Sequence, residues 1–309
     1  MTKQEQILND PNYKPIHNHG FVGLIDTMGS DEEIAQAARV SYGGNVETRT
    51  TSETRNLLRY MMRQAHTSPF EMAEVKFHLK LPIMVMRQLI RHRTANVNEY
   101  SGRYSEMSDE FYVPDFDYME AQSTTNKQGR AGEISEMDKK AIKDLIDEAN
   151  EICYFNYKEL LGEPVETANY VRTQPFFDED YPGLARELAR GVLPVSNYTE
   201  CYWKIDLHNF FHFCRLRLDS HAQREIRDFA TAMYDFAKPY FPLSMEAFED
   251  YVLYSRTLSR MDILAIRDML EGKFVPDPAY YGMSKREYTE FVDFFSPKAL
   301  HSWQQLRTE

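Results

Sequence analysis

The stretch EVKFHLKLPIMVMRQLIRHR, residues 74–93, contains the change of hydrophobic period that decides the fold. In its first half apolar and polar residues alternate, which is typical of a strand with one buried face. Pro82 ends the alternation and suits the first turn of a helix, because the missing N–H of proline has no helical partner there. The second half has helical spacing. We therefore predict a strand over residues 74–81, followed directly by a helix that ends in Arg-His-Arg.

A similar pair of elements lies nearer the N-terminus. The segment FVGLIDTM, residues 21–28, predicts a strand. Ser30, with Glu33 three residues later, predicts a capping box that begins the next helix. The segment VSNYTECYWKI, residues 195–205, predicts another strand. Further helices are predicted over residues 51–66, 133–161 and 183–193.

Asp206 is expected to N-cap a long helix, because its carboxylate can accept hydrogen bonds from the first helical N–H groups. Helical spacing then continues over residues 207–241. The strands and helices do not alternate as regular parallel β-α-β units do. We therefore predict an α/β protein of the mixed α+β kind, with a central sheet and long helices.

Length and composition bound the class of protein. The 309 residues, 42% of them hydrophobic, allow a substantial core in one large domain or two ordinary ones. Residues 1–18 are polar, without the apolar core of a signal peptide, and we interpret them as an N-terminal arm. The three cysteines form no disulfide framework, which favours a reducing, cytoplasmic location. A net charge of −12 argues against general nucleic-acid binding, and no apolar run is long enough to span a membrane.

The segment RHRTANVNEYSGRY, residues 91–104, concentrates cations and hydrogen-bonding side chains in this acidic chain. Arg87 and Arg91 are one helical turn apart and share one side of the predicted helix. Cations at a helix C-terminus can simply complement the helix dipole. That explanation does not account for Arg103, which lies beyond the intervening loop. Because arginine binds phosphate and carboxylate groups with a rigid pair of donors, we predict a local anion-binding site.

Two further segments hold polar groups among apolar ones. In ELARGVLP, residues 187–194, Arg190 either extends along an apolar surface to water or points into a shared pocket. His208 and His212 have the His-x-x-x-His spacing of a zinc pair, but the Glu of HExxH is absent, so no metal site is predicted. Hydrogen-bonded imidazoles inside a helical interface, or contacts to a cofactor, are the alternatives. The residues that follow are too polar for one buried face, so some must line a cavity or an interface: Arg215, Arg217, Asp219, His221 and Gln223.

Several common catalytic signatures are absent from the sequence. It contains no GxGxxG fingerprint, no Walker A loop and no GxSxG elbow. The arginine-rich segments contain no cysteine, which argues against a thiolate nucleophile in this site.

These segments, in this order, resemble the flavin-dependent thymidylate synthases. The hallmark of that family is Arg-His-Arg, then seven or eight residues, then Ser; here Arg91-His92-Arg93 precedes Ser101 by seven residues. The extended pattern RHRxxSxNExSxRY departs only at Asn96, where many members carry Ser. Further matching segments are GFVGLIDTMG, AARVSY, HTSPFE, ELARGVLP and LRLDSHAQREI.

The resemblance runs from about residue 19 to about residue 255, which implies a single catalytic domain over 19–255. The segments near 120–132 and 162–183 are interpreted as insertions, and 256–309 as a C-terminal helical extension. The family implies a homotetramer with FAD bound where subunits meet and active sites shared between chains. Its members methylate dUMP at C5 to give dTMP, with methylenetetrahydrofolate as the carbon donor and NADPH-reduced FAD as the hydride donor.

The resemblance also implies roles for individual residues toward dUMP. Arg217 matches the residue that stabilises the N3-deprotonated uracil, and Ser101 lies beside the reacting base without acting as a covalent nucleophile. These two are the expected catalytic residues. The residues from Glu99 to Arg103 match a nucleotide loop that comes from a neighbouring subunit. The expected dUMP-binding residues are Gln88, Leu89, Ile90, Arg91, Glu99, Tyr100, Ser101, Gly102, Arg103, Arg190 and Arg217.

For FAD the resemblance implies a second set of residues. The sequence departs from the Asn-x-Arg pattern of some members at residues 206–212. The expected FAD-binding residues are His66, Ser68, Arg91, His92, Arg93, Glu99, Asp206, Leu207, His208 and His212. A nucleotide- or anion-binding protein without turnover is the alternative from a different class. A metal-dependent hydrolase that uses His208 and His212 is a more distant one.

Overall fold

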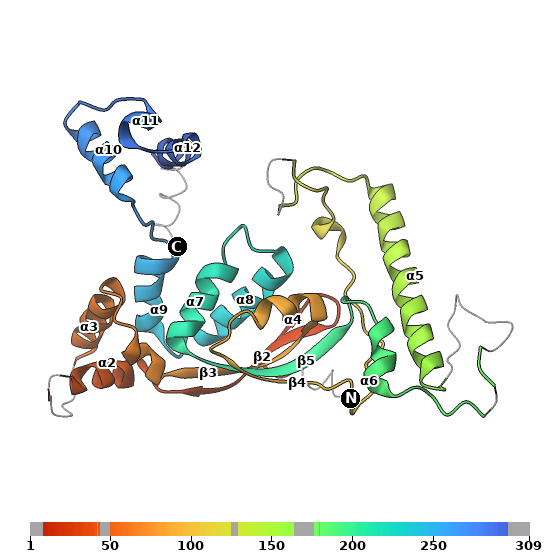
Figure 1. Cartoon of the computed structure of the whole chain (residues 1–309). Coiled ribbons are helices and arrows are strands. Elements are labelled where there is room, and N and C mark those ends of the chain that lie inside the picture. The colour runs from red at the N-terminus through yellow and green to blue at the C-terminus, as the bar shows by residue number, and fades with distance from the viewer. Residues whose placement is uncertain are drawn as a thin grey trace. The chain divides into compact units, whose positions relative to one another are not determined.

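The computed structural model describes residues 9–41, 43, 50–124, 129–163, 176–178 and 180–295. Most of the expected insertion at 162–183, residues 125–128 of the other insertion and the polar tail from residue 296 lie outside this description. The chain divides into two compact units, Met1–Leu253 and Tyr254–Glu309. Figure 1 shows the elements of both units.

The first unit is built on a five-stranded antiparallel sheet. Its strands are β1 (Tyr13–Ile16), β2 (Gly20–Met28), β3 (Glu74–Pro82), β4 (Asn96–Glu99) and β5 (Tyr198–Asp206). Their order in the sheet is β1-β2-β3-β5-β4, and every neighbouring pair is antiparallel. The predicted strands over 21–28, 74–81 and 195–205 are confirmed as β2, β3 and most of β5, and the mixed α+β class is confirmed.

The alternation in β3 arises as the sequence predicts. Val75, Phe77, Leu79 and Leu81 are all fully buried. Phe77 packs against Trp203 of β5, with ring centroids 6.5 Å apart. The expectation for the opposite face is wrong at one position: His78 is buried, because Tyr202 stacks on its ring at 4.6 Å and Tyr13 and Glu200 hydrogen-bond to its two ring nitrogens.

Two strands, β1 and β4, were not predicted from the sequence. β1 belongs to the segment interpreted as a polar arm, and its backbone pairs with Phe21 to Gly23 of β2 and with Gly20. β4 lies within the segment interpreted as a loop and pairs along the edge of β5. All four β4 side chains are exposed. β1 buries only Ile16 and β4 buries no side chain, so hydrophobic patterning could not indicate either strand.

Helices cover one face of this sheet. α4 (Ile83–Leu89) contacts β3, α7 (Leu207–Arg217) contacts β5, and α8 (Arg224–Ala237) contacts β2 (Figure 1). α8 also contacts both α4 and α7, so the three helices pack together on the sheet. The remaining helices of the unit are α2 (Asp31–Val40), α3 (Thr51–Arg63), α5 (Glu136–Leu160), α6 (Arg186–Ala189) and α9 (Pro242–Phe248).

The predicted caps are partly confirmed. Asp206 accepts a hydrogen bond from Asn209 N at 2.9 Å and begins α7. Ser30 accepts one from Glu33 N at 3.3 Å, which is one half of the expected capping box. The helix predicted over 183–193 is shorter: α6 is followed by a 3₁₀ helix over Arg190–Val192.

The prediction of one long helix over 207–241 is wrong, because residues 218–223 separate α7 from α8. The Asp219 carboxylate accepts a hydrogen bond from His221 N at 2.8 Å, and Ala222 N donates to Asp219 O at 2.9 Å. An aspartate that bonds the backbone two residues on offers the chain a turn in place of a helix. The break gives Arg217 and Gln223 positions that a continuous helix would not.

The described part of the second unit contains α10 (Arg260–Leu270), α11 (Pro278–Tyr281) and α12 (Lys285–Phe294). It has a small core of its own around Ala265, Tyr281, Met283 and Phe291. In neither unit is a described helix both long and apolar enough to cross a membrane.

Candidate functional site

The prediction that the helix ends in Arg-His-Arg is wrong, because α4 ends at Leu89 and the Arg-His-Arg run follows it as a turn. This run meets the C-terminal end of α7. His92 is 7% exposed and lies in a turn, with its N bonded to Leu89 O. Arg217 Nε donates to His92 Nε2 at 3.1 Å, and the other end of its guanidinium donates to Gln88 O at 3.3 Å. Two separate acceptors therefore hold the Arg217 guanidinium in one orientation. The structure thus brings together Gln88, His92 and Arg217, three of the residues predicted from the sequence.

This contact requires a neutral imidazole, and the surroundings keep it neutral. Burial, with the charge of Arg217 and then the nearby His212, lowers the pKa of His92 to about 4. Burial and the charge of Arg91 also lower the pKa of Arg217 from its ordinary value. The guanidinium groups of Arg91 and Arg217 repel each other, and the neutral ring of His92 does not offset their charge. A bound anion would reduce this repulsion.

His92 is expected to make stability depend on pH between about 4 and 6.5. The unfolded chain protonates this residue near pH 6.5, whereas the folded chain does so only near pH 4. Within this window the unfolded chain binds more protons, so the free energy of unfolding falls as the pH falls, by on the order of 3 kcal/mol in total. Urea unfolding of the flavin-free protein at several pH values measures this slope.

A His92→Gln variant should show a flatter slope than the wild type across the same pH window. His221→Gln is the matched control, because His221 is an exposed histidine. Its ring forms a hydrogen bond with Asp219. His92→Gln should flatten the slope more than His221→Gln does. Equal slopes for wild type and His92→Gln would mean that His92 is not held neutral in the folded protein.

The second half of the motif lies at the other end of β4. Glu99 ends the strand and accepts a hydrogen bond from Thr199 Oγ1 at 2.8 Å. Gly102 is buried against Arg190: a Cβ on this glycine would lie 3.1 Å from Arg190 Cδ and 2.9 Å from Met107 Sδ. A larger residue here would therefore force the Met107 or Arg190 side chain to shift.

Arg103 and Arg190 are the cations of this second group, and both are exposed. Arg103 Nε donates to Glu187 Oε2 at 3.0 Å, across the surface of the short helix that leads to Arg190. β4 separates this group from the Arg217 group: its four residues span about 10 Å at the usual rise of a strand. Within one chain the motif thus divides into two cationic groups, one before β4 and one after it.

A pocket of about 220 Å³ lies between α3, the turn that follows it and α7. Its floor includes the apolar side chains of Met61, Phe70 and Phe211. Its polar lining comes from His66, His208, His212 and Arg215. The structure therefore brings His66 beside His208 and His212, which lie far from it in the sequence, and all three are expected at FAD.

Other predicted residues take different positions. The side chains of Leu89 and Leu207 lie in the core, so only their backbones are available to a ligand. Asp206 uses both carboxylate oxygens on Asn209, at 2.9 Å and 2.8 Å. Ser68 begins a 3₁₀ helix beside His66 and is exposed. Also exposed are Ile90, Arg91, Arg93 and Tyr100, whereas Ser101 is partly exposed.

Two residues beside these groups were not among the predicted site residues. Arg215 lines the pocket, and Gln223 Oε1 accepts a hydrogen bond from Gln88 Nε2 at 2.6 Å. The excess of polar residues over 215–223 indicated that some of them line a cavity or an interface, and this is confirmed for both. The sequence alone did not indicate which ones.

Neither Cys201, in β5, nor Cys214, in α7, is suited to act as a nucleophile. Burial raises the pKa of Cys201 to about 12 and raises the pKa of Cys214 well above its ordinary value. Among the residues that the structure describes, no group of three His, Cys, Asp or Glu side chains is arranged to hold a metal ion.

Comparison with known proteins gives consistent matches over most of the chain. The family model described as thymidylate synthase complementing protein matches residues 23–243. A Rickettsia typhi protein named flavin-dependent thymidylate synthase is 46% identical over 279 residues, which cover 90% of this chain and 92% of that protein. A Ruegeria pomeroyi protein of the same name is 45% identical over 279 residues, covering 90% and 86%. The crystal structure of the UMP/dUMP methylase PolB from Streptomyces cacaoi, bound with 5-Br dUMP, has a TM-score of 0.66 and 33% identity, over 79% of this chain and 100% of that chain.

Proposed function

Because this chain belongs to the flavin-dependent thymidylate synthase family, we propose that its two cationic groups bind dUMP and that the histidine-lined pocket holds part of FAD. The reaction is methylation of dUMP at C5 to give dTMP, in an FAD-dependent methyltransferase. The single observation that carries the proposal is the guanidinium of Arg217, fixed between His92 and Gln88 O and repelled by Arg91.

The chemistry explains why a fixed guanidinium belongs here. Loss of the N3 proton places negative charge on the uracil ring and enriches C5 in electron density. Arg217 stabilises this anion, and because two acceptors already orient its donors, it need not reorganise when the charge develops. Arginine cannot itself remove the proton, since its pKa is too high. Arg91, Arg103 and Arg190 supply further positive charge for the phosphate.

The pocket that contains His66, His208, His212 and Arg215 fits a flat, phosphorylated cofactor, because its floor is apolar and its polar lining consists mainly of imidazole rings and a guanidinium. Bound FAD, reduced by NADPH, would supply the hydride, while methylenetetrahydrofolate supplies the carbon. The described volume of about 220 Å³ is below the roughly 300–1,000 Å³ of pockets that enclose a drug-sized ligand. One chain would therefore hold only part of the dinucleotide.

A homotetramer with shared active sites completes this proposal. β4 is an exposed edge strand, and edge strands of this kind are usually covered or paired. Large apolar side chains are exposed beside both cationic groups: Ile90, Val97, Tyr100, Tyr104 and Tyr202. Such a surface favours contact with another copy of the chain. We propose that the group before β4 in one subunit faces the group after β4 in another, and that the assembly is cytoplasmic.

The domain organisation is proposed on the same basis. Residues 19–255 form the catalytic domain, preceded by an N-terminal arm whose strand β1 joins the sheet of that domain, and followed by a helical extension. The segments near 120–132 and 162–183 are additions to the catalytic domain.

A visible absorption spectrum tests the binding part of the proposal directly. The purified protein with added FAD should show bound-flavin absorbance, and titration with dUMP should change that spectrum, because the nucleotide lies beside the flavin. A protein that remains without flavin absorbance after FAD is added and the excess removed would contradict the proposal. Titration with inorganic phosphate at the same concentrations is the control for a general anion effect.

A further inference from the structure

A lysine on α5 is buried against the segment that follows the nucleotide loop. Lys158 is 8% exposed, and lysine is rarely buried to this degree unless it is paired. Its Nζ donates to the carboxylate of Glu106 and, at 2.6 Å, to Oε2 of Glu163. Glu106 lies three residues after Arg103, whereas Glu163 lies just beyond the end of α5. The buried ammonium therefore joins α5 to the chain beside the nucleotide loop.

A second contact from α5 reaches the next residue of the same segment. Met107 N donates to Tyr157 OH at 3.1 Å, and both residues are buried. Met107 and Tyr157 form a small core with Ala189, the residue before Arg190. Met107 Sδ also lies 2.9 Å from the position that a Cβ on Gly102 would take. The nucleotide loop and Arg190 are thus supported by the same few side chains, in a cluster apart from the main core.

Hydrogen bonds within the segment connect the nucleotide loop to Glu106. Ser101 O accepts hydrogen bonds from Tyr104 N at 3.1 Å and from Ser105 N at 3.0 Å. Tyr100 OH donates to the backbone oxygen of Glu106 at 2.6 Å. Glu106 therefore bonds the loop through its backbone and α5 through its carboxylate. Without that carboxylate the loop would keep its internal turn but lose a fixed position on α5.

The ammonium of Lys158 remains charged in these surroundings. Burial alone would lower the pKa of Lys158, but hydrogen bonds with Glu106 and Glu163 more than offset burial and raise it above its ordinary value. Hydrogen bonds between two charged groups are shorter and stronger than neutral ones. The bond to Glu106 therefore restricts the position of this segment more than a neutral contact would.

We propose that Lys158 is a positioning residue for dUMP binding, which holds the nucleotide loop in its binding conformation through Glu106. This inference rests on the proposed function, in which the cationic group after β4 binds dUMP. A loop released from α5 would adopt the binding conformation only part of the time. The measured affinity falls in proportion to the fraction of molecules in that conformation, so a loop ordered in about a tenth of them binds about tenfold more weakly.

The test compares the two carboxylates that share the Lys158 ammonium. Glu106→Ala releases the segment beside the nucleotide loop. Glu163→Ala is the matched control, because it removes the other acceptor and leaves Lys158 bonded to Glu106. Lys158→Met removes the ammonium itself and keeps an unbranched side chain. Titration of FAD-loaded protein with dUMP, followed by the flavin spectrum, gives the dissociation constant, and steady-state methylation gives kcat and KM.

In Glu106→Ala and Lys158→Met, the dissociation constant and KM of dUMP should rise about tenfold, while kcat at saturating dUMP and FAD binding stay near their wild-type values. The double variant should bind dUMP no more weakly than either single variant, because both substitutions remove the same bond. Glu163→Ala should bind dUMP as the wild type does. If Lys158→Met does not fold, Glu106→Ala decides, because the Glu106 side chain is one-third exposed.

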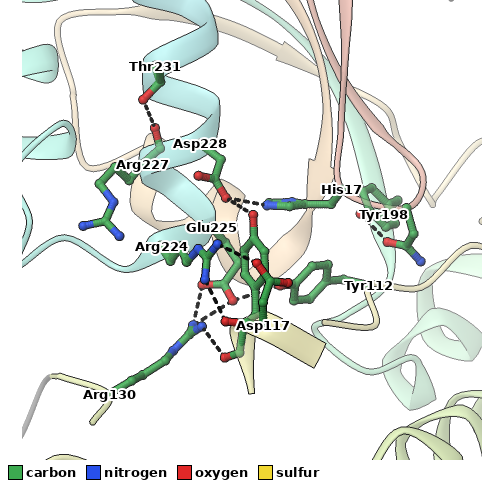
Figure 2. Close-up of polar contacts among 12 residues, drawn as sticks. His17, Tyr112, Asp117, Arg130, Tyr198, Arg224, Glu225, Arg227, Asp228 and Thr231 are labelled. Atoms are coloured by element: carbon green, nitrogen blue, oxygen red, sulfur yellow. Dashed lines mark hydrogen bonds and ion pairs between the residues drawn. The ribbon is translucent and has the colours of Figure 1, made fainter. Parts of the chain in front are cut away.

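Asp228→Asn controls for a general loss of stability. Its partly buried carboxylate bonds His17 Nε2 at 3.0 Å and Tyr118 OH at 2.8 Å, neither of which belongs to the nucleotide loop (Figure 2). Unchanged dUMP affinity in Glu106→Ala overturns the proposal, as does an equal loss in Glu163→Ala or Asp228→Asn, which would indicate a structural role. Wild-type protein that binds FAD but no dUMP would instead contradict the proposed function, so the two failures are distinguishable.

Discussion

Replacing Arg217 with alanine is expected to lower the rate of methyl transfer by about two to three powers of ten, while the protein still folds and binds FAD. The guanidinium is oriented before substrate arrives, by His92 Nε2 and Gln88 O. Removal of one such preorganised donor from a developing anion typically costs about 3 kcal/mol of transition-state stabilisation. Single-turnover formation of dTMP by the reduced, FAD-loaded protein measures the effect.

Arg217→Lys is the informative companion variant. Lysine keeps the charge but lacks the planar pair of donors that reaches two acceptors at once, so a rate between those of wild type and Arg217→Ala is expected. Arg227→Ala serves as a control, because that arginine lies on α8 and donates to Ser220 O, away from His92. Wild-type turnover in Arg217→Ala would mean that a different residue stabilises the uracil anion.

The second large effect is recovery of activity when two inactive variants are mixed. Arg190→Ala should mainly weaken dUMP binding, because Arg190 belongs to the cationic group after β4 and lies against the nucleotide loop at Gly102. If each site combines Arg217 of one subunit with Arg190 of another, mixed assemblies contain some sites with both residues intact. Random mixing should then restore about a quarter of wild-type activity, because each position is intact in half of the chains.

The experiment is performed by mixing Arg217→Ala and Arg190→Ala proteins under conditions that exchange subunits, and assaying at low dUMP concentration. Mixing each variant with itself is the control and should leave activity at the level of the single variant. If both arginines of a site came from the same chain, every site in the mixture would carry one substitution. No recovery after demonstrated subunit exchange would contradict shared sites.

The sequence predicted the parts of the fold that have a face to bury. β3 alternates because one side lies on the core, and the period changes at Pro82 because the chain turns into α4. β4 could not be predicted, since all of its side chains are exposed and its place is set by backbone pairing with β5. The break after Arg217 depends on a turn made by Asp219, a local hydrogen bond that competes with helical spacing.

The candidate site was predictable as a set of residues and unpredictable as an arrangement. Arg91, His92 and Arg103 could be chosen from the sequence because cations and amides cluster there. The division of this motif by β4 into two groups required the structure. So did the neutral state of His92, which depends on its burial beside Arg217. The hydrogen bond from Gln88 to Gln223 joins α4 to the residue that precedes α8, and no spacing within the sequence indicates it.

This chain belongs to a family that transfers a methyl group to C5 of dUMP in a flavin-dependent reaction. Methylation at C5 replaces the hydrogen on that carbon, so release of tritium from [5-³H]dUMP reports it directly. With FAD, NADPH and methylenetetrahydrofolate present, we expect tritium release together with formation of dTMP, and neither when FAD is omitted. If protein that binds both FAD and dUMP releases no tritium, the chain does not catalyse this reaction and is a nucleotide-binding protein without turnover.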